Sequence, residues 1–186
     1  MKDLFRGELV RLAALNPEEI GPLLSRWDRD SLRIRLLDSD APILFSAKAR
    51  KEWLEKQIEK ETYFGFSIRA LADDRVVGEI GLGGLRWAFG DAFVGIGLGD
   101  RADWNKGYGT EAMRLVLRYA FLELNLHRVS LGVFEYNQRA MRSYEKAGFQ
   151  VEGRIRGDLH RDGRRWDGVF MGVLRSEWMK QFGGQL

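Results

Sequence analysis

The stretch WNKGYGTEAM, from Trp104 to Met113, places two glycines one residue apart, directly before a long apolar helical pattern. The first N–H groups of a helix have no backbone partner and carry partial positive charge, so they can bind a phosphate. Gly107 and Gly109 would let the loop backbone approach such a ligand closely, because neither has a Cβ. Lys106 adds a charge and Thr110 a hydroxyl. The stretch therefore predicts either a phosphate-binding helix start or a glycine-rich turn without a ligand.

Two other phosphate-binding motifs do not account for these glycines. The P-loop pattern G-x-x-x-x-G-K-[ST] is absent from the sequence. A dinucleotide pattern, G-x-G-x-x-A, occurs at Gly97, Gly99 and Ala102, but it leads into DWNKG rather than into a helix. That pattern needs a helix directly after it, so we do not expect a dinucleotide site.

Composition restricts the chemistry. The 186 residues suit one domain, and 45% hydrophobic with 31% charged residues indicates a folded protein with a core. The absence of cysteine excludes disulfides, thiolate metal sites and a cysteine nucleophile, and with two histidines we expect no metal site. A net charge of +3 allows an anionic ligand without requiring nucleic acid, so we expect no direct nucleic-acid partner.

The beginning of the sequence points to a cytoplasmic location. MKDLFRGELV has neither the apolar region nor the cleavage site of a secretory signal. No run in the sequence approaches the roughly 20 apolar residues of a membrane span. We therefore expect no membrane partner.

Hydrophobic periodicity predicts one α/β domain without a linker or a repeat. Asn16 and Pro17 mark a helix start, and Asn137 and Gly148 are typical of the two ends of a second helix. Residues 29–42 are polar and give no clear assignment. The expected strands are residues 7–15, 63–71, 75–85, 91–100, 128–134, 149–159 and 164–174, and the expected helices are residues 16–27, 47–61, 106–125 and 137–147.

Several motifs taken together resemble the GNAT superfamily of N-acetyltransferases. They are W-N-K-G-Y-G-T-E-A, N-L-H-R-V, N-Q-R-A-M-R-S-Y-E-K-A-G-F and E-G-R-I-R. The resemblance covers roughly residues 7–174 and is dense over residues 94–156. Within the superfamily, the sequence is most similar to the branch that includes the ribosomal-protein N-terminal acetyltransferases and the spermidine acetyltransferases. Trp104 stands where many members have Gln or Arg, and tryptophan is usual in the branch that modifies ribosomal proteins.

The resemblance implies a single N-acetyltransferase domain over residues 1–186, with a mixed, splayed β-sheet flanked by helices. Acetyl-CoA, the implied cosubstrate, would lie between the strands at residues 94–99 and 128–134, with its pyrophosphate on the loop 105–110 and without a metal. Asn137 matches a residue that contacts the pantetheine arm, and Tyr144 one that lies near the sulfur. The expected cofactor-binding residues are Leu98, Gly99, Asn105, Lys106, Gly107, Tyr108, Gly109, Thr110, Asn137 and Tyr144.

The implied reaction is direct attack of a primary amine on the thioester, without a covalent enzyme intermediate. Tyr144 is the candidate acid for the leaving thiolate, although Ala140, Tyr144 and Ala147 also share a helix face that could simply pack. Glu79 is the candidate base, although it could equally be a sheet glutamate that faces solvent.

Other polar and aromatic residues have less specific expectations. We expect His127 to pack or cap near the end of the preceding helix and His160 to be solvated. The basic run over residues 154–165 is interspersed with acidic residues, so it reads as a solvated hairpin, with contact to a CoA phosphate or an acidic acceptor as the alternative. Three aromatic residues could line an acceptor pocket or belong to the core: Trp27, Trp87 and Phe89.

The acceptor stays open at this point. A protein N-terminus is the first expectation, and a small amine such as a polyamine, an amino acid or an antibiotic is the alternative. A non-catalytic CoA-binding module is a further alternative, and a homodimer is compatible with the sequence. RNA binding by the basic hairpin is not expected, because the interleaved aromatic platform is missing.

Overall fold

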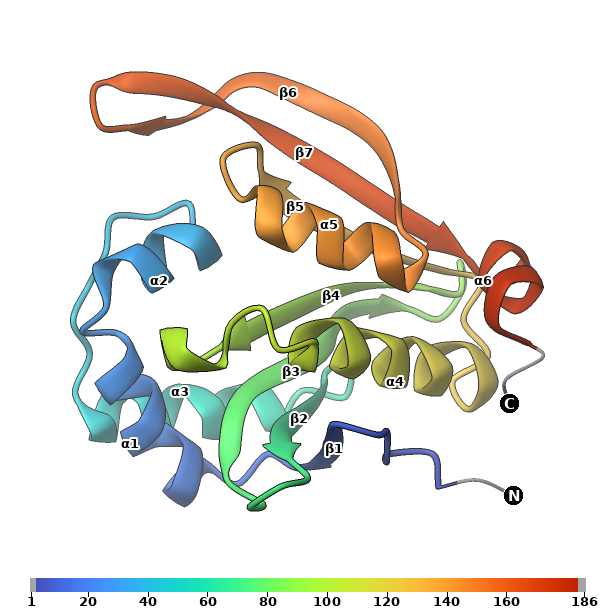
Figure 1. The fold of residues 1–186 in the computed structure, drawn as a ribbon, viewed down its shortest axis with the longest axis horizontal. Helices are drawn as coiled ribbons and strands as arrows, with labels where there is room; N and C mark the ends of the chain where they lie inside the picture. The colour runs from blue at the N-terminus through green and yellow to red at the C-terminus, as the bar shows by residue number, and fades with distance from the viewer. Residues whose placement is uncertain (1–2, 184–186) are drawn as a thin grey trace.

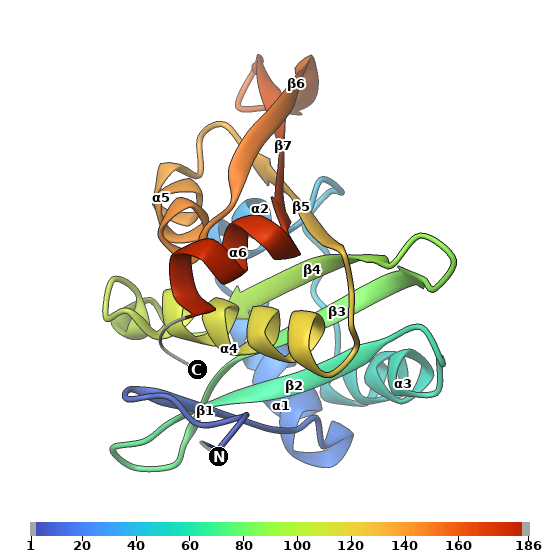
Figure 2. The same cartoon turned by 90° about the vertical axis from the view of Figure 1, so that its right-hand side faces the viewer.

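The computed structural model describes residues 3–183, which form a sheet with the strand order β1-β2-β3-β4-β5-β7-β6 and helices on both of its faces (Figures 1 and 2). The strands are β1 (Val10–Ala14), β2 (Phe64–Ala70), β3 (Val76–Arg86), β4 (Asp91–Leu98), β5 (Arg128–Phe134), β6 (Gln150–Arg161) and β7 (Arg164–Leu174). The helices are α1 (Pro17–Trp27), α2 (Ser31–Leu37), α3 (Ala47–Ile58), α4 (Tyr108–Leu122), α5 (Gln138–Ala147) and α6 (Arg175–Phe182). The predicted α/β class is confirmed.

The sheet opens between its two central strands. β4 and β5 pair in parallel only through Asp91, Ala92 and Phe93, although β4 continues to Leu98 and β5 to Phe134. Beyond Phe93 each strand keeps only its outer neighbour, which is β3 for β4 and β7 for β5. Figure 1 shows the two halves meeting on the right and separating toward α2 on the left. The predicted mixed, splayed sheet is confirmed.

The larger core lies between the sheet and α4. Alternate residues of β4 point to this face, because side chains of a strand alternate between the two faces of the sheet. Ala92 and Val94 are buried there, and Leu115 and Val116 of α4 are buried against the same cluster. Figure 2 shows α4 lying across the strands. The apolar stripe expected for this helix therefore forms the main contact with the sheet.

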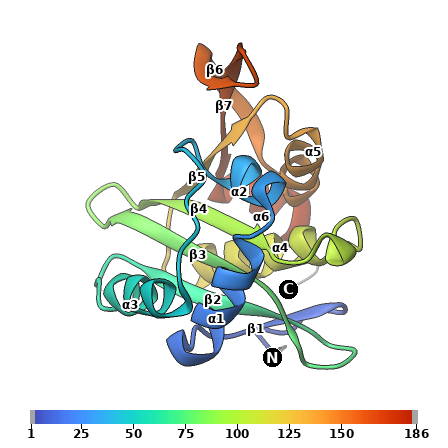
Figure 3. The same cartoon turned by 90° about the vertical axis from the view of Figure 1, so that its left-hand side faces the viewer.

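A second, smaller core lies on the opposite face, under α1 and α3 (Figure 3). Asn16 caps α1, since its Oδ1 accepts a hydrogen bond from the Glu18 N–H at 3.0 Å. Gly21 lets the two helices come close, because a Cβ there would stand 2.9 Å from the backbone nitrogen of Lys51. Trp27, at the end of α1, is buried in this core. This packing brings the end of α1 close to the end of β4.

Two helices were not expected from the sequence. α2 lies in the unassigned stretch and buries only Arg33 and Ile34, so it has no apolar periodicity to detect. Its start is fixed by Asp30, whose side chain accepts from the Leu32 N–H at 3.1 Å. α6 follows β7 directly, and its buried face has only Trp178 and Phe182.

The polar face of α4 holds the N-terminal segment. The Glu111 carboxylate accepts hydrogen bonds from the N–H groups of Glu8, Leu9 and Val10 at 2.8, 2.7 and 2.7 Å. Arg118 donates to the backbone oxygens of Asp3 and Leu4. No helix within residues 3–183 has both the length and the apolar character needed to cross a membrane.

Candidate active site

A cleft of about 320 Å³ lies where β4 leaves β5, between the start of α4 and α5. Most of the residues expected to bind the cofactor line it: Leu98, Asn105, Gly107, Tyr108, Gly109, Thr110, Asn137 and Tyr144. Gly99, Lys106 and Glu79 do not belong to the lining. The fold thus brings together residues that lie as far apart in the chain as Leu98 and Tyr144.

The glycine loop leaves the start of α4 open. Asn105 and Gly107 both have positive φ, at 62° and 87°, and Gly107 is the N-cap of α4. Because glycine has no side chain, no side chain caps the N–H groups of the first turn. Successive free N–H groups at a helix start can bind a phosphate. A Cβ at Gly109 would meet only ordinary packing contacts, since the nearest heavy atom, Leu98 Cδ1, would lie 3.6 Å from it.

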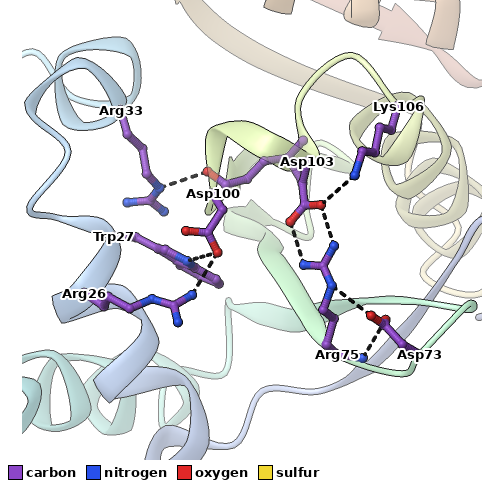
Figure 4. A network of polar contacts seen from close by, with 9 residues as sticks. Arg26, Trp27, Arg33, Asp73, Arg75, Asp100, Asp103 and Lys106 are labelled. Atoms are coloured by element: carbon purple, nitrogen blue, oxygen red, sulfur yellow. Dashed lines mark hydrogen bonds and ion pairs between the residues drawn. The ribbon is translucent and has the colours of Figure 1, made fainter.

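A buried carboxylate, that of Asp103, links this loop to Arg75, which lies between β2 and β3, and to Lys106. Asp103 is 1% exposed and accepts hydrogen bonds from the Arg75 guanidinium at 2.6 and 2.5 Å (Figure 4). The same carboxylate accepts from Lys106 Nζ at 3.4 Å. The Arg75 guanidinium lowers the pKa of Asp103. The ammonium of Lys106 is therefore already paired with Asp103, and this expected phosphate ligand does not line the cleft.

Asn137 and Tyr144 lie at the two ends of the cleft wall that α5 forms. Asn137 caps α5, since its Oδ1 accepts from the Ala140 N–H at 3.2 Å, and its Nδ2 donates to the Leu36 oxygen at 3.3 Å. Tyr144 packs on the larger core and also lines the cleft. Burial raises the pKa of Tyr144 to about 12, so its hydroxyl keeps its proton at neutral pH. The two roles considered for Tyr144, packing and facing the ligand, are compatible.

Glu79 faces the other side of the sheet. It pairs with Gly97 across β3 and β4, and its Oε1 lies 3.4 Å from the Arg33 guanidinium. Burial raises the pKa of Glu79, and the nearby Arg33 opposes that shift. Its Oε2 has no hydrogen-bond partner among residues 3–183. Arg33 lines the cleft and Glu79 does not, so the arginine separates this carboxylate from the cleft.

Two backbone groups expected to meet the pantetheine arm already have partners. The Leu98 oxygen accepts from Arg33 Nε at 2.9 Å, and the Gly99 N–H donates to the Val77 oxygen at 2.9 Å. The Trp27 ring packs against Gly99, where a Cβ would collide with it. Figure 4 shows Trp27 and Arg33 converging on the segment that ends at Asp100.

The remaining candidate residues lie away from the cleft. Trp27 belongs to the smaller core, whereas Trp87 and Phe89 are 55% and 69% exposed in the turn before β4, at the opposite end of that strand from Leu98. His160 is exposed, as expected. The expectation that His127 packs or caps was wrong for its side chain, which is exposed and makes no hydrogen bond within residues 3–183. Its backbone is bonded instead: the His127 N–H donates to the Gly90 oxygen, and the His127 oxygen accepts from the Arg175 N–H.

Comparison with known proteins gives the family. A family model described as an acetyltransferase (GNAT) domain matches residues 10–150. A probable N-acetyltransferase of Bacillus subtilis, YjcK, is 40% identical over 124 residues, which are 66% of this chain and 68% of the relative. The protein belongs to the GNAT acetyltransferase family. The resemblance inferred from the sequence motifs is thereby confirmed.

Further relatives of this GNAT protein differ in the acceptor that their names state. A putative ribosomal N-acetyltransferase of Bacillus subtilis, YdaF, is 32% identical over 114 residues, covering 61% of this chain and 62% of the relative. A solved structure of the Vibrio cholerae spermidine N-acetyltransferase, in complex with CoA and spermine, has a TM-score of 0.80 and 23% identity and covers 93% of this chain and 99% of the other. The structural similarity supports the fold.

The candidate residues of this GNAT protein lie on both faces of the sheet. Ile96 and Leu98 point to the face that carries Tyr144, because they pack on the larger core together. Glu79 and Gly97 point to the face that carries α1 and α2. Sequence reasoning missed Arg33, Asp103 and Arg75, because the contacts of Arg33 with Leu98 and Glu79, and that of Arg75 with Asp103, join residues distant in the chain.

Proposed function

We propose that this GNAT protein transfers an acetyl group from acetyl-CoA to the α-amino group of a protein or peptide N-terminus. The observation that carries the proposal is the cleft between β4 and β5, which joins an open helix start to a protonated tyrosine and has no unpaired carboxylate in its described lining. The first two features suit the donor, and the third concerns the acceptor.

The donor would lie along the cleft between α4 and α5. Its pyrophosphate would bind the N–H groups at the start of α4, next to Gly107 and Gly109. The pantetheine arm would run between Leu98 and Asn137, where it would have to displace Arg33 from the Leu98 oxygen in order to bond there. The thioester would then lie near Tyr144.

The chemistry needs no covalent intermediate. The neutral amine attacks the thioester carbonyl carbon, the C–S bond breaks, and the proton lost by the amine finally resides on the CoA thiol. An ordinary thiol has a pKa of about 8.5, and that of Tyr144 is about 12. Full proton transfer from Tyr144 to the thiolate would therefore be uphill. We propose that Tyr144 stabilises the developing thiolate by donating a hydrogen bond.

The lining of the cleft favours a singly charged acceptor. Asp103 is the one carboxylate in the described lining, and Arg75 and Lys106 already neutralise it. A polyamine, with several ammonium groups, would find no free anion in this described lining. An N-terminal peptide brings one amine and can place neutral atoms against Leu36 and Leu37.

The amine's own pKa supports the same choice. At pH 7 about a tenth of N-terminal amines, with an ordinary pKa of about 7.7–8.0, is neutral, against about one in 2,500 for a lysine-like amine of pKa about 10.4. Glu79 lies on the acceptor face and stays our candidate base, but it could act only through water or after Arg33 moves. Deprotonation of the amine by Glu79 through water would be enough for an acceptor that is already partly neutral at pH 7.

A free-thiol release assay tests the proposal. Acetyl-CoA is supplied with a panel of N-terminal peptides, the same peptides with acetylated N-termini, and spermidine. We expect thiol release with the free peptides at a kcat/KM at least tenfold above that with spermidine, and none with the blocked peptides. Preference for spermidine would overturn the proposed acceptor, and no thiol release with any amine would overturn the transfer itself.

A further inference from the structure

We propose that three charged residues, Asp28, Arg33 and Arg50, are positioning residues that set how strong a base Glu79 is in the transfer reaction. This proposal rests on the proposed function, in which Glu79 is the candidate base. The three residues come from three helical segments. Asp28 is the C-cap of α1, Arg33 belongs to α2 and Arg50 belongs to α3. Their charges meet beside β3, where Glu79 stands.

The four side chains form one chain of alternating charge. Arg50 Nε lies 2.5 Å from Asp28 Oδ2, and the other oxygen of that carboxylate lies 3.2 Å from Arg33 Nη1. Arg33 Nη2 in turn lies 3.4 Å from Glu79 Oε1. Asp28 and Arg33 are only 2% and 3% exposed. Because buried charges are screened little by solvent, a change of charge at one end of this chain is felt at the other.

Arg33 divides its donors among several acceptors, and Glu79 has the longest of these contacts. Its Nε donates to the Leu98 oxygen at 2.9 Å, and Asp28 holds one of its terminal nitrogens. Arg33 therefore cannot form the strong two-pronged pair with Glu79 that a free guanidinium would form. The buried Oε2 of Glu79 has no hydrogen-bond partner in the part of the chain that the structure describes. Oε2 is thus the oxygen that can take a proton.

The other groups that face Glu79 carry no charge at neutral pH. Ser67 is its partner across β2, and the Ser67 hydroxyl donates to backbone oxygens of β1. Gly97, its partner across β4, has no side chain. Burial and the charge of Glu79 raise the pKa of Tyr63, just before β2, to about 12, so its hydroxyl stays neutral. Among the described residues, the charges that act on Glu79 are therefore those of the three positioning residues.

The two ends of the Asp28–Arg50 ion pair act on Glu79 with opposite signs. Burial raises the pKa of Glu79, the two arginines lower it, and the Asp28 carboxylate raises it. Asp28→Asn leaves both guanidiniums to Glu79, so Glu79 should become a weaker base. Arg50→Gln leaves Asp28 to Arg33 alone, so Glu79 should become a stronger base. Both substitutions break the same ion pair, so a merely structural role would move Glu79 in the same direction in both variants.

Carbon-13 NMR titration of the full chain, with labelled glutamate carboxyl groups, measures the ionisation of Glu79 without any substrate. Loss of one signal in Glu79→Gln identifies the group. We expect its midpoint at lower pH in Asp28→Asn and at higher pH in Arg50→Gln, with the wild type between them. The two midpoints should differ by at least about 0.5, less than the shift of about 1–3 that a directly paired charge causes. Arg50→Lys, which keeps the charge, should restore the wild-type midpoint.

Thiol release with acetyl-CoA and an N-terminal peptide completes the test. The acidic limb of kcat should move in the same directions as the NMR midpoints, since the acceptor's own ionisation is common to all variants. The matched controls are Asp40→Asn and Arg29→Gln, two exposed residues outside this chain of charges, and both should keep the wild-type midpoint.

Three results would overturn the positioning role: midpoints that do not move, midpoints that move in the same direction, or a kcat limb that stays fixed while the midpoints separate. Melting curves check that each variant folds. If the buried Asp28→Asn does not fold, Arg50→Gln still decides, because a midpoint that is unchanged or at lower pH contradicts the proposal. No thiol release by the wild type with any amine would instead overturn the proposed function, whereas the NMR midpoints do not depend on it.

Discussion

At the scale of single residues, the environment of Tyr144 determines what it can do. Tyr144 lines the cleft, and burial raises its pKa from 10.0 to about 12. A group that remains protonated can donate a hydrogen bond over the whole neutral and mildly alkaline range. The residue was predictable from the family motif, but its weak acidity depends on burial that the sequence does not display.

Tyr144→Phe removes that donor and leaves the ring. We predict that kcat falls at least tenfold, because a hydrogen bond to a charged group contributes about 1.5–3 kcal/mol, while the Kd for CoA changes less than about threefold. Stopped-flow or steady-state thiol release gives kcat, and calorimetry gives Kd. In the wild type, kcat should show no loss from ionisation of this tyrosine below pH 10, since the raised pKa lies above the ordinary value of 10.0. An unchanged kcat in the variant would refute the proposed donor role.

Glu79→Gln tests the candidate base. A carboxylate acts as a base only when ionised, and burial raises the pKa of Glu79 above its ordinary 4.5. The wild-type rate should therefore fall as the pH drops through that raised pKa. We predict that the variant loses this acidic limb and that its kcat falls by about 100-fold, the lower end of the range of general-base effects, because Glu79 would act through water. Glu52→Gln, an exposed change on α3, is the control. A variant that keeps both the limb and the rate would show that Glu79 is not the base.

At the scale of elements, the loop before α4 depends on residues that are distant in sequence. Asp103 pairs with Arg75, which is 28 positions away, so no local pattern could reveal the pair. Similarly, α2 has no apolar stripe that would predict a helix. The role of its Arg33 follows only from its contacts with the Leu98 oxygen and Glu79, which the sequence does not show. The strongly periodic α4 and the capped α1 and α5 were predictable, because their signals are local.

Asp103→Asn should loosen this loop. We expect a loss of about 2 kcal/mol in the free energy of unfolding at pH 7, from weakened charge-assisted hydrogen bonds. The folded-state pKa of Asp103 lies below the ordinary 3.8, so its contribution is present above that value and is lost as the pH falls below it. The variant and the wild type should therefore converge in stability at low pH. Denaturant titrations at pH 7 and below pH 3.8 measure this, and a constant difference at both pH values would contradict the assignment.

At the scale of the whole molecule, the separation of β4 from β5 leaves the cleft in which we propose that the donor binds. The sequence motifs predicted the splay through family resemblance alone, because periodicity does not specify which strands pair or where pairing stops. The homodimer remains a prediction. Because the proposed donor binds the folded state, acetyl-CoA at about 100 times its Kd should stabilise the protein by about 2.7 kcal/mol. A melting curve with no shift under that condition would contradict donor binding.

We propose that the donor binds in the opening between β4 and β5. A crystal structure of the protein with CoA and an N-terminal peptide tests it most directly. We expect the pyrophosphate on the backbone of residues 105–110, the sulfur within hydrogen-bond distance of the Tyr144 hydroxyl, and the peptide amine entering from the face that carries Glu79. CoA bound outside the opening between β4 and β5, or a sulfur remote from Tyr144, would contradict it.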